Sequence, residues 1–493
     1  MLWIALYLPE LPLQIAERAA PPLSGETSRA PFVIKHGSEQ RPLIFAASSA
    51  AQQAGICSGM TVAAAQALSG GLLVLARDVA AEDAALHNLA AWARQFTPAV
   101  ALESGQGLLL EVGSCLSLFK GLPSLLHRVR RGLYELGYHT AVGVAPTARG
   151  AWLLAKASVT KTGVRSCTEL SELPSRLNTL PLTLFDWAPA TLSALQDLGV
   201  KRIGQFRALP RDGAIQRFGP EPAQQMDQAF GLRPDPRLYH TAPEIYRARI
   251  EFLYEVTQVE ALLFSIKRLL LELEGFLRAR GAGVQQFTLV LEHQDCHKPR
   301  SRISVGLLAP ERDALRLLAL ARERLEHHLP RTPVLAISLE ADTPLPYAAI
   351  NHSLLPDTRN QTLGWRQLRE RLQARLGQDK LFVLQAGNDH RPEFATVLAG
   401  ECDSRHAKPP CHPQPRPLWL LPEPKKLTLV AEQPQYHGAL TLTAGPERIE
   451  TGWWDAQLVN RDYYVACNES GETLWIYREH QHQAAWFLHG LFA

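Results

Sequence analysis

The stretch VALESGQGLLLEVG, residues 100–113, is the most informative part of the chain for its architecture. Its second half, GLLLEV, is a continuous apolar run of strand length, as is LWIALYL at residues 2–8, and both predict buried strands. Helical patterns lie between and after them, at residues 78–96 (DVAAEDAALHNLAAWARQF) and 124–137 (SLLHRVRRGLYELG). This alternation of strands and helices over residues 1–160 indicates an α/β or α+β layered domain.

Length and composition bound the class of protein. A chain of 493 residues suggests about three or four domains. The net charge is only +3, so a nucleic-acid surface must come from local clustering of cations. Seven scattered cysteines fit a reducing cytoplasm better than a disulfide framework. The first residues, MLWIALYLPELPL, have no basic segment and no apolar run of about 18 residues follows, so we expect neither a signal peptide nor a membrane span.

Residues 171–235 change to short helices separated by Gly and Pro. Their centre, LSALQDLGVKRIGQFRAL at residues 192–209, predicts a helix, a Gly-Val hairpin and a second helix. Backbone N–H groups at such a hairpin bind phosphate oxygens without reading sequence. The candidate DNA-binding residues are Gly199, Val200, Lys201, Arg202, Gly204 and Arg207. A plain αα-hairpin with glycine caps is the alternative.

Residues 240–345 predict the order strand, helix, strand, strand, helix, strand, which is that of a split βαβ domain. Cations flank these strands at Arg278, Arg280, Lys298, Arg300 and Arg302. They could follow a nucleic-acid backbone or simply be solvated, because acidic residues nearly balance them in number.

Residues 346–425 predict a linker with one helix, and five prolines between residues 409 and 417 indicate an extended spacer. Cys402, His406, Cys411 and His412 lie in this stretch. They lack the close Cys-Cys pair that is typical of zinc sites, so we expect a linker rather than a metal site.

Residues 426–493 are rich in aromatic side chains, and stretches of period two around Asn-Glu-Ser-Gly predict a hairpin in a small β-rich module. The module's own core would use most of these rings, while an interaction surface could use others. The candidate partner-binding residues are Trp453, Trp454, Arg461, Asp462, Tyr463, Trp475 and His489.

Three segments resemble motifs of Y-family translesion DNA polymerases. FAASSAAQQAGICSGM (residues 45–60) resembles A-x-x-Y-E-A-R-x-x-G-V-x-x-G-M, and residues 100–113 resemble the strand pair S-I-D-E-A-Y-L-D-V. GVAPTARGAWLLAKAS (residues 143–158) resembles G-I-G-x-N-K-x-L-A-K-x-A-S. The resemblance implies an α+β multidomain fold with palm and fingers at 1–170, a helix-hairpin-helix thumb at 171–235 and a little finger at 240–345. The linker (346–425) and the C-terminal module (426–493) would follow.

In this register the family's metal-binding carboxylates fall on Leu8, Gln106 and Gly107. Its triphosphate-contacting Tyr and Arg fall on Ser49 and Gln52, and only Lys156 keeps its residue type. Two Mg²⁺ ions need several converging carboxylate oxygens, which Leu, Gln and Gly cannot supply. We therefore expect no polymerase activity, no bound metal and no cofactor.

The whole arrangement, and above all the segment from GPERIETGWW (residues 445–454) onward, resembles the inactive polymerase-like members of bacterial DNA-damage (SOS) mutasomes. This resemblance implies a cytoplasmic, nucleoid-associated adaptor in error-prone translesion synthesis. Such an adaptor binds primer-template or single-stranded DNA. It links the sliding clamp to an error-prone C-family polymerase alpha subunit and to a RecA-like accessory protein of the ImuA type.

The family's clamp-binding peptide, similar to Q-L-x-L-F, has two candidates: NHSLLPD at residues 351–357 and QTLGW at residues 361–365. An extended peptide that inserts apolar anchors into a pocket is the expected mode of binding. The candidate anchors are His352, Leu354, Leu355, Gln361, Leu363 and Trp365.

Two other functions remain open at this point. An active translesion polymerase could use the displaced carboxylates of Glu10, Glu103 and Glu111. A nuclease-like or RecA-like enzyme is disfavoured because the chain has no G-x-x-x-x-G-K-[ST] loop.

Overall fold

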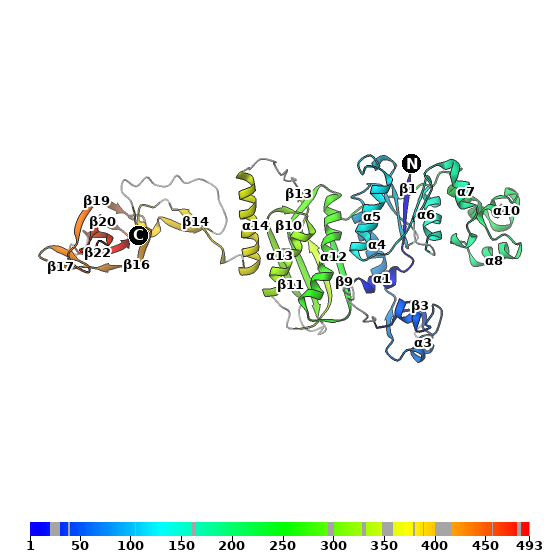
Figure 1. The fold of residues 1–493 in the computed structure, drawn as a ribbon, viewed down its shortest axis with the longest axis horizontal. Helices are drawn as coiled ribbons and strands as arrows, with labels where there is room; N and C mark the ends of the chain where they lie inside the picture. The colour runs from blue at the N-terminus through cyan, green and yellow to red at the C-terminus, as the bar shows by residue number, and fades with distance from the viewer. Residues whose placement is uncertain are drawn as a thin grey trace. The chain divides into compact units, whose positions relative to one another are not determined.

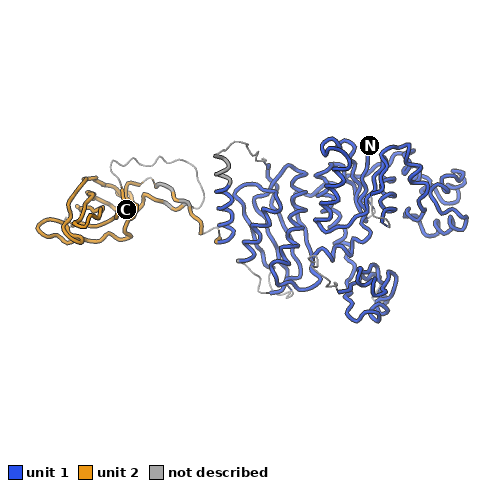
Figure 2. The backbone as a smooth tube through the Cα atoms, viewed as in Figure 1, with its two compact units in different colours: residues 1–375 blue, residues 376–493 orange. Residues whose placement is uncertain are grey.

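The computed structural model describes residues 1–19, 30–37, 40–103, 105–159, 164–293, 300–327, 332–347, 358–377, 380–387, 389–399, 416–455, 457–480 and 485–492. They form two compact units, residues 1–375 and 376–493 (Figure 2). The first unit mixes helices and sheets, and the second consists mainly of strands (Figure 1). The predicted α+β multidomain class, with an additional C-terminal β region, is confirmed.

A five-stranded sheet in the order β5-β6-β1-β7-β8 forms the palm-like part. Its strands are β1 (Trp3–Tyr7), β5 (Val100–Glu103), β6 (Gly107–Glu111), β7 (Ala141–Ala145) and β8 (Arg165–Ser166). Helices α4 (Val79–Ala93) and α5 (Leu122–Leu136) pack on one face, and α6 (Ala148–Ala157) packs on the other (Figure 1). β1 is apolar along its length because Ile4 and Leu6 join the core under α4 and α5, while Trp3 and Ala5 join the core under α6.

A smaller three-stranded sheet, in the order β3-β2-β4, forms the finger-like part. Its elements, with the helix that precedes it, are α1 (Leu11–Glu17), β2 (Phe32–His36), β3 (Leu43–Ala47), α2 (Ser49–Gln53), α3 (Val62–Leu68) and β4 (Leu73–Ala76). The Ser48 and Thr61 side chains accept backbone N–H groups at the starts of α2 and α3, each at 3.3 Å. These N-caps fix where the two short helices begin.

The thumb-like part is a series of short helices on the α6 side of the palm-like sheet (Figure 1). They are η2 (Leu170–Glu172), α7 (Leu173–Leu177), η3 (Leu182–Leu184), α8 (Pro189–Asp197), α9 (Ile203–Arg207), α10 (Arg211–Phe218) and α11 (Pro220–Ala229). Their core is aromatic, since Phe185 and Trp187 stack at 4.6 Å and Phe206 packs against Trp187 at 5.1 Å.

The next part has the predicted split βαβ order. Its elements are β9 (Arg247–Val256), α12 (Val259–Arg278), β10 (Ala282–His293), β11 (Ser301–Glu311), α13 (Ala314–His327), β12 (Val334–Ala341) and β13 (Leu345–Pro346). The main sheet runs β11-β10-β12-β9, and α12 and α13 share its core. Helix α12 also packs on the palm-like part, where the Trp92 ring fills the space that Gly132 and Gly275 leave open.

A buried polar cluster joins α1 to α12. Arg18 forms an ion pair with Glu272 and donates to the Tyr138 hydroxyl, and Tyr246 donates to Glu272 at 3.0 Å. All four side chains are almost inaccessible to solvent. Because removal of one partner from a buried ion pair leaves an uncompensated charge, this cluster strongly favours the observed packing of α12 on the palm-like part.

The residues after the split βαβ part continue into α14 (Thr358–Leu376), whose Glu370 accepts from Arg316 at 2.5 Å. Residues 376–493 contain β14 (Val383–Ala386), η5 (Pro392–Phe394), β15 (Thr396–Ala399), β16 (Trp419–Lys426), β17 (Thr428–Val430), β18 (Gln433–Gln435), β19 (Thr441–Thr451), β20 (Val459–Cys467), β21 (Thr473–Glu479) and β22 (Trp486–Leu491). The main C-terminal sheet runs β16-β22-β21-β20-β19. The predicted hairpin around Asn-Glu-Ser-Gly is confirmed as β20 and β21.

The boundary between the expected linker and the C-terminal module needs a correction. The β14–β15 hairpin lies in the stretch that was predicted to be a linker with one helix, and β16 begins before residue 426 and pairs with β22. The C-terminal unit therefore begins at Leu376. The four Cys and His residues considered for zinc, Cys402, His406, Cys411 and His412, lie outside the described residues. A search of the described helices found none with the length and apolar character of a membrane span.

Candidate functional site

The three positions that were predicted to correspond to metal ligands lie at one end of the palm-like sheet. Leu8 follows β1, is only 1% exposed and belongs to the apolar core under α4 and α5. Its backbone N–H donates to the Gln106 carbonyl at 2.8 Å, so the two positions are adjacent in space. Gly107 lies opposite Tyr7 in the β1–β6 pairing, and Gln106 is exposed in the turn before β6.

Gly107 has no room for a side chain. A Cβ atom added there would lie 2.9 Å from the Trp152 ring and closer still to the Leu6 carbonyl oxygen. Trp152 comes from α6 and packs edge-to-face on Tyr7, with ring centroids 5.2 Å apart. An indole ring therefore occupies the space in which a carboxylate at position 107 would need to lie.

Of the remaining glutamates, Glu103 lies on a strand at this end of the sheet, opposite Gly107 in the β5–β6 pairing, but its carboxylate is already paired. Glu103 forms a mostly buried ion pair with Arg237, which also binds Asp235 at 2.5 Å. Glu111 lies at the opposite end of β6, about 13 Å away along the strand, and accepts the Gly113 N–H at 3.1 Å. Glu10 is exposed at the start of α1.

These residues do not fit a two-metal centre. Hard divalent cations need several oxygen ligands at about 2.0–2.6 Å, and those oxygens would have to come from side chains that are apolar, absent or already paired here. No group of three or more His, Cys, Asp or Glu residues within the described part of the chain could hold a metal ion.

Lys156, the one nucleotide-site residue that keeps its type, is engaged within the protein. Its ammonium group lies 2.7 Å from a carboxylate oxygen of Asp186, and its own side chain is largely buried. Ser49 and Gln52 are exposed on α2, and the Gln52 amide donates to the Ala47 carbonyl at 2.8 Å. No contact joins these two residues to Lys156 among the interactions described.

The same end of the palm-like sheet also holds charges that the sequence motifs did not single out. Burial lowers the pKa of Arg149, which lies on α6 near the Asp235–Arg237 pair. Burial raises the pKa of the Tyr7 hydroxyl, and the nearby Asp186 carboxylate raises it further. Nothing in the local sequence indicated Trp152 or Arg237, because their partners are far away along the chain.

The thumb-like hairpin differs from its prediction in one respect. Every backbone N–H from Gly199 to Gln205 has an acceptor within the protein. The Gln205 side-chain oxygen accepts the N–H groups of Lys201 at 2.9 Å and Arg202 at 3.0 Å. The Gly204 N–H donates to the Asn178 carbonyl at 3.0 Å. The expected free N–H groups are therefore not present, because carbonyl groups within and before α8, the Arg202 carbonyl and the Gln205 side chain already accept them.

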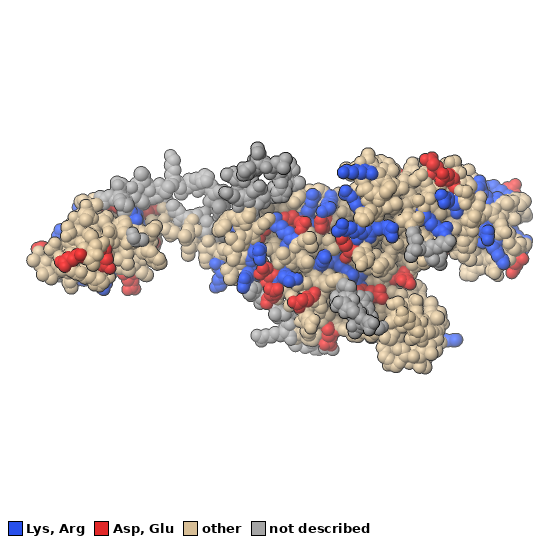
Figure 3. Space-filling view, in the orientation of Figure 1, with Lys and Arg blue, Asp and Glu red and all other residues tan. Residues whose placement is uncertain are grey.

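Basic side chains remain available at this hairpin. Lys201, Arg202 and Arg207 are exposed, and Arg207 stacks over Phe230 at 4.4 Å. Arg211, in contrast, makes two hydrogen bonds to Asp227, at 2.8 and 2.6 Å. Figure 3 shows Lys and Arg side chains on the surface of this part, near the α8 and α10 labels of Figure 1.

The sheet of the split βαβ part carries matched charges on its open face. Arg249 pairs with Glu292 at 3.0 Å, and Arg302 pairs with Glu340 at 2.7 Å. Among the other cations considered, Arg300 also pairs with Glu292, Arg278 pairs with Glu274, Arg280 donates to the carbonyls of Ala242 and Pro243, and Lys298 lies outside the described residues. Paired cations attract phosphate less than unpaired ones, so this face is a weaker candidate than the thumb-like hairpin.

The two clamp-binding candidates differ in what the structure describes. His352, Leu354 and Leu355 lie outside the described residues. Gln361, Leu363 and Trp365 lie within α14, so this segment is helical instead of extended as predicted. The Trp365 side chain is 65% exposed.

Most of the C-terminal candidates for partner binding are buried in their own unit. Tyr463, Trp475 and His489 stack on one another, and Tyr463 bonds to His489 Nδ1 at 2.8 Å. Burial lowers the pKa of His489 to about 4. Arg461 and Asp462 are also mostly buried, and hydrogen bonds from Arg448 lower the pKa of Asp462 to about 2.

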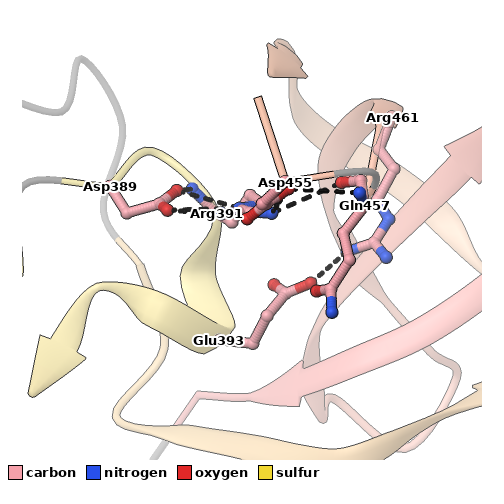
Figure 4. A network of polar contacts seen from close by, with 6 residues as sticks. All are labelled: Asp389, Arg391, Glu393, Asp455, Gln457 and Arg461. Atoms are coloured by element: carbon pink, nitrogen blue, oxygen red, sulfur yellow. Dashed lines mark hydrogen bonds and ion pairs between the residues drawn. The ribbon is translucent and has the colours of Figure 1, made fainter. Parts of the chain in front are cut away.

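Trp453 and Trp454 are the exposed members of that set, at 79% and 55%. They lie in the turn between β19 and β20, which Arg391 holds from the loop before η5 (Figure 4). Arg391 donates to Asp455 at 2.6 Å and to Asp389 at 2.8 Å, and these hydrogen bonds lower the pKa of both carboxyl groups. Sequence reasoning placed Arg391 in a linker and therefore missed this contact.

Comparisons with known proteins find similar sequences and structures. The impB/mucB/samB family matches residues 12–156, so the palm-like and finger-like parts form a domain of the Y-family polymerase class. "Protein ImuB" from two Caulobacter vibrioides strains, NA1000 / CB15N and ATCC 19089 / CB 15, is 28% identical over 464 residues in each case. The match covers 89% of this chain and 100% of each relative. The chain is a homologue of ImuB.

Two solved structures are similar to the chain over part of its length. DinB from Sulfolobus solfataricus is 16% identical, with a TM-score of 0.40 over 70% of this chain and 99% of that one. An insertion ternary complex of Dbh DNA polymerase is 15% identical, with a TM-score of 0.41 over 70% of this chain and 100% of that one.

Proposed function

We propose that the protein is a non-catalytic, polymerase-like adaptor that acts in error-prone translesion synthesis after DNA damage. The observation that carries this proposal is the packing of the Trp152 ring and the Leu6 carbonyl against Gly107. Phosphoryl transfer depends on metal ions and carboxylates held in a defined geometry, and this packing leaves no space for one of them. Leu8 contributes to the apolar core at a second ligand position.

The alternative, an active polymerase with displaced carboxylates, finds little support in the same geometry. Glu103 is neutralised by Arg237, and Glu111 lies at the far end of the strand. To share a metal ion, these two side chains would need the β5–β6 hairpin to rearrange. A catalytic group must lie within about 0.5 Å of its productive position, so such a rearrangement is a severe requirement.

DNA binding is the first activity that we assign to the adaptor. The exposed side chains of Lys201, Arg202 and Arg207 support contact with phosphates, although the backbone of their hairpin is already bonded within the protein. Such contacts would be independent of sequence and sensitive to salt.

Partner binding is the second activity. By analogy with the family, we propose as partners the sliding clamp, an error-prone C-family polymerase alpha subunit and a RecA-like protein of the ImuA type. A peptide between residues 350 and 366 would bind the clamp. The C-terminal unit would bind the polymerase or the RecA-like protein, because it presents Trp453 and Trp454 to solvent and aromatic side chains are enriched at interface hot spots.

A bridging assay tests the adaptor role. Clamp loaded on DNA should retain the C-family subunit only when this protein is present. Leu354→Ala with Leu355→Ala tests the first clamp candidate, and Leu363→Ala with Trp365→Ala tests the second. The pair that is used should weaken clamp binding by about 2 kcal/mol or more. Equal retention of the polymerase with and without the protein would contradict the adaptor role.

A further inference from the structure

Helix α5 carries a strip of basic and aromatic side chains on the face of the palm-like sheet that is opposite to the thumb-like part. Its inner face is apolar, with Leu125, Val129, Leu133 and Leu136 buried. On its outer face, His127, Arg130, Arg131 and Tyr134 follow the spacing i, i+3, i+4, i+7, so they form a single stripe along the helix. His139, just after the helix, extends it, and its ring lies 6.0 Å from that of Tyr134.

The charge of this strip is mostly uncompensated. Residues 114–140 contain four Lys or Arg residues and only one carboxylate, that of Glu135. Glu135 pairs with Arg131 at 2.9 Å, but both side chains are exposed, and exposed pairs of this kind contribute little. Arg130 forms no hydrogen bond or ion pair with any residue that the structure describes. In Figure 3, blue side chains gather over the region that Figure 1 labels α5.

A hollow of about 550 Å³ lies beside the strip. The residues of the strip, His127, Arg130, Arg131, Tyr134 and His139, all line it, and none of its lining residues is acidic. Tyr134 is one of the lining residues and is 69% exposed. The hollow thus combines cations and an accessible aromatic ring within one part of the palm-like domain.

Single-stranded nucleic acid has the chemistry that fits these features. Its phosphates suit spaced guanidinium groups, and its unpaired bases stack on exposed aromatic rings, whereas an acidic peptide would gain little from Tyr134. We propose that the α5 strip (His127, Arg130, Arg131, Tyr134 and His139) is a second nucleic-acid contact. It takes a short stretch of single-stranded DNA independently of the thumb-like hairpin. Since α5 and the thumb-like helices lie on opposite faces of the palm-like sheet, the two contacts hold different segments of a DNA strand.

The test uses the full-length protein and a fluorescently labelled oligothymidine, with binding measured by anisotropy at several salt concentrations. Arg130→Glu with Arg131→Glu should weaken binding roughly 10-fold or more at low salt and reduce the salt slope by about 1–2. Tyr134→Ala should weaken binding about 5-fold or more without changing the salt slope, because stacking is not ionic. All three side chains are exposed, so the melting temperature should not change.

Arg322→Glu with Arg478→Glu is the matched control, since it makes the same change in net charge at exposed positions outside the strip. This control should bind the oligothymidine like the parent. If the strip variants bind it as the control does, while charge reversal at Lys201, Arg202 and Arg207 removes all binding, the proposal is wrong. The proposal is equally wrong if the strip variants lose binding only to a polyglutamate probe, because the strip would then recognise an acidic protein.

Discussion

Two closely packed glycines, Gly107 at the start of β6 and Gly452 in the turn after β19, differ in where their neighbouring aromatic rings lie. At Gly107 the neighbouring ring of Trp152 is turned inward and fills the space that a side chain at this position would need. At Gly452 the neighbouring groups are Arg391 and the Gln457 carbonyl, and the following rings of Trp453 and Trp454 are turned outward to solvent. The first position lies in the core, and the second supports two exposed rings. The proposed function predicts different consequences of substitution at the two places.

Substitution at Gly107 should give the largest effect. Gly107→Glu forces a charged side chain against the Leu6 carbonyl and the Trp152 ring, so it should lower the free energy of unfolding by at least about 3 kcal/mol. Gln106→Asp, at the exposed neighbouring position, is the control and should change it by less than about 0.5 kcal/mol. Denaturant unfolding of the full chain measures both. Equal stability of the two variants would mean that the palm-like edge can still accept a carboxylate.

For the exposed turn between β19 and β20, we expect a loss of partner binding without a loss of stability. Trp453→Ala with Trp454→Ala should leave the melting temperature unchanged, because both rings are exposed, yet weaken binding of the polymerase or RecA-like partner by about 2 kcal/mol or more. Titration calorimetry with each purified partner measures the loss.

Arg391→Met tests whether the conformation of this turn, and not only its two exposed rings, is needed for partner binding. Removing Arg391 frees the turn and leaves Asp389 and Asp455 without their shared cation, so both melting temperature and partner binding should fall. Wild-type affinity for both partners in the double tryptophan variant would exclude this turn as their binding surface.

Charge reversal at Lys201, Arg202 and Arg207 tests whether the thumb-like hairpin contacts DNA. It should weaken primer-template binding roughly 10-fold at low salt and reduce the salt slope by about 2–3, because each phosphate contact releases counterions. Arg211→Glu with Asp227→Arg, which exchanges a paired set of charges on the same part, should have a smaller effect. An unchanged salt slope in the triple variant would place the DNA contact elsewhere.

Acid should destabilise the C-terminal unit. The pKa of His489 is about 4 in the folded protein, because the ring is buried, against an ordinary value near 6.5. The unfolded chain therefore takes up a proton that the folded chain does not. The free energy of unfolding should fall as pH drops from about 6.5 to 4, by up to about 1.4 kcal/mol per pH unit. His489→Gln should flatten this dependence, whereas His240→Gln, in the other unit, should leave it in place for the C-terminal unit.

The sequence predicted well those features that depend on local pattern. The apolar run at residues 2–8 predicted β1, and the alternation of strands and helices predicted the split βαβ order, because both follow from periodicity and element length. The assignment of Leu8, Gln106 and Gly107 to metal-ligand positions stays a prediction from motif register. The structure adds that the three positions lie close together at one end of the sheet.

Features that depend on distant partners could not be found in this way. Nothing near Gly107 in the sequence indicates the Trp152 ring, and nothing near Asp455 indicates Arg391, which comes from a stretch rich in proline and polar residues. At the thumb-like hairpin the glycine pattern predicted a turn, and the structure has one. The sequence could not show that the Gln205 side chain points back to accept two N–H groups of this turn. The sequence identified the aromatic residues of the C-terminal unit only as a set. The structure is needed to show that Trp453 is exposed and Trp475 is buried.

Primer extension tests the central claim most directly. The purified protein is incubated with primer-template DNA, Mg²⁺ and all four dNTPs, and anisotropy in the same buffer confirms that the DNA is bound. We predict bound DNA and no extension above a no-protein control. We predict the same result for Leu8→Asp with Gln106→Asp, because the third ligand position at Gly107 remains filled. Template-dependent extension by the parent protein that is lost on Glu103→Gln would contradict the account.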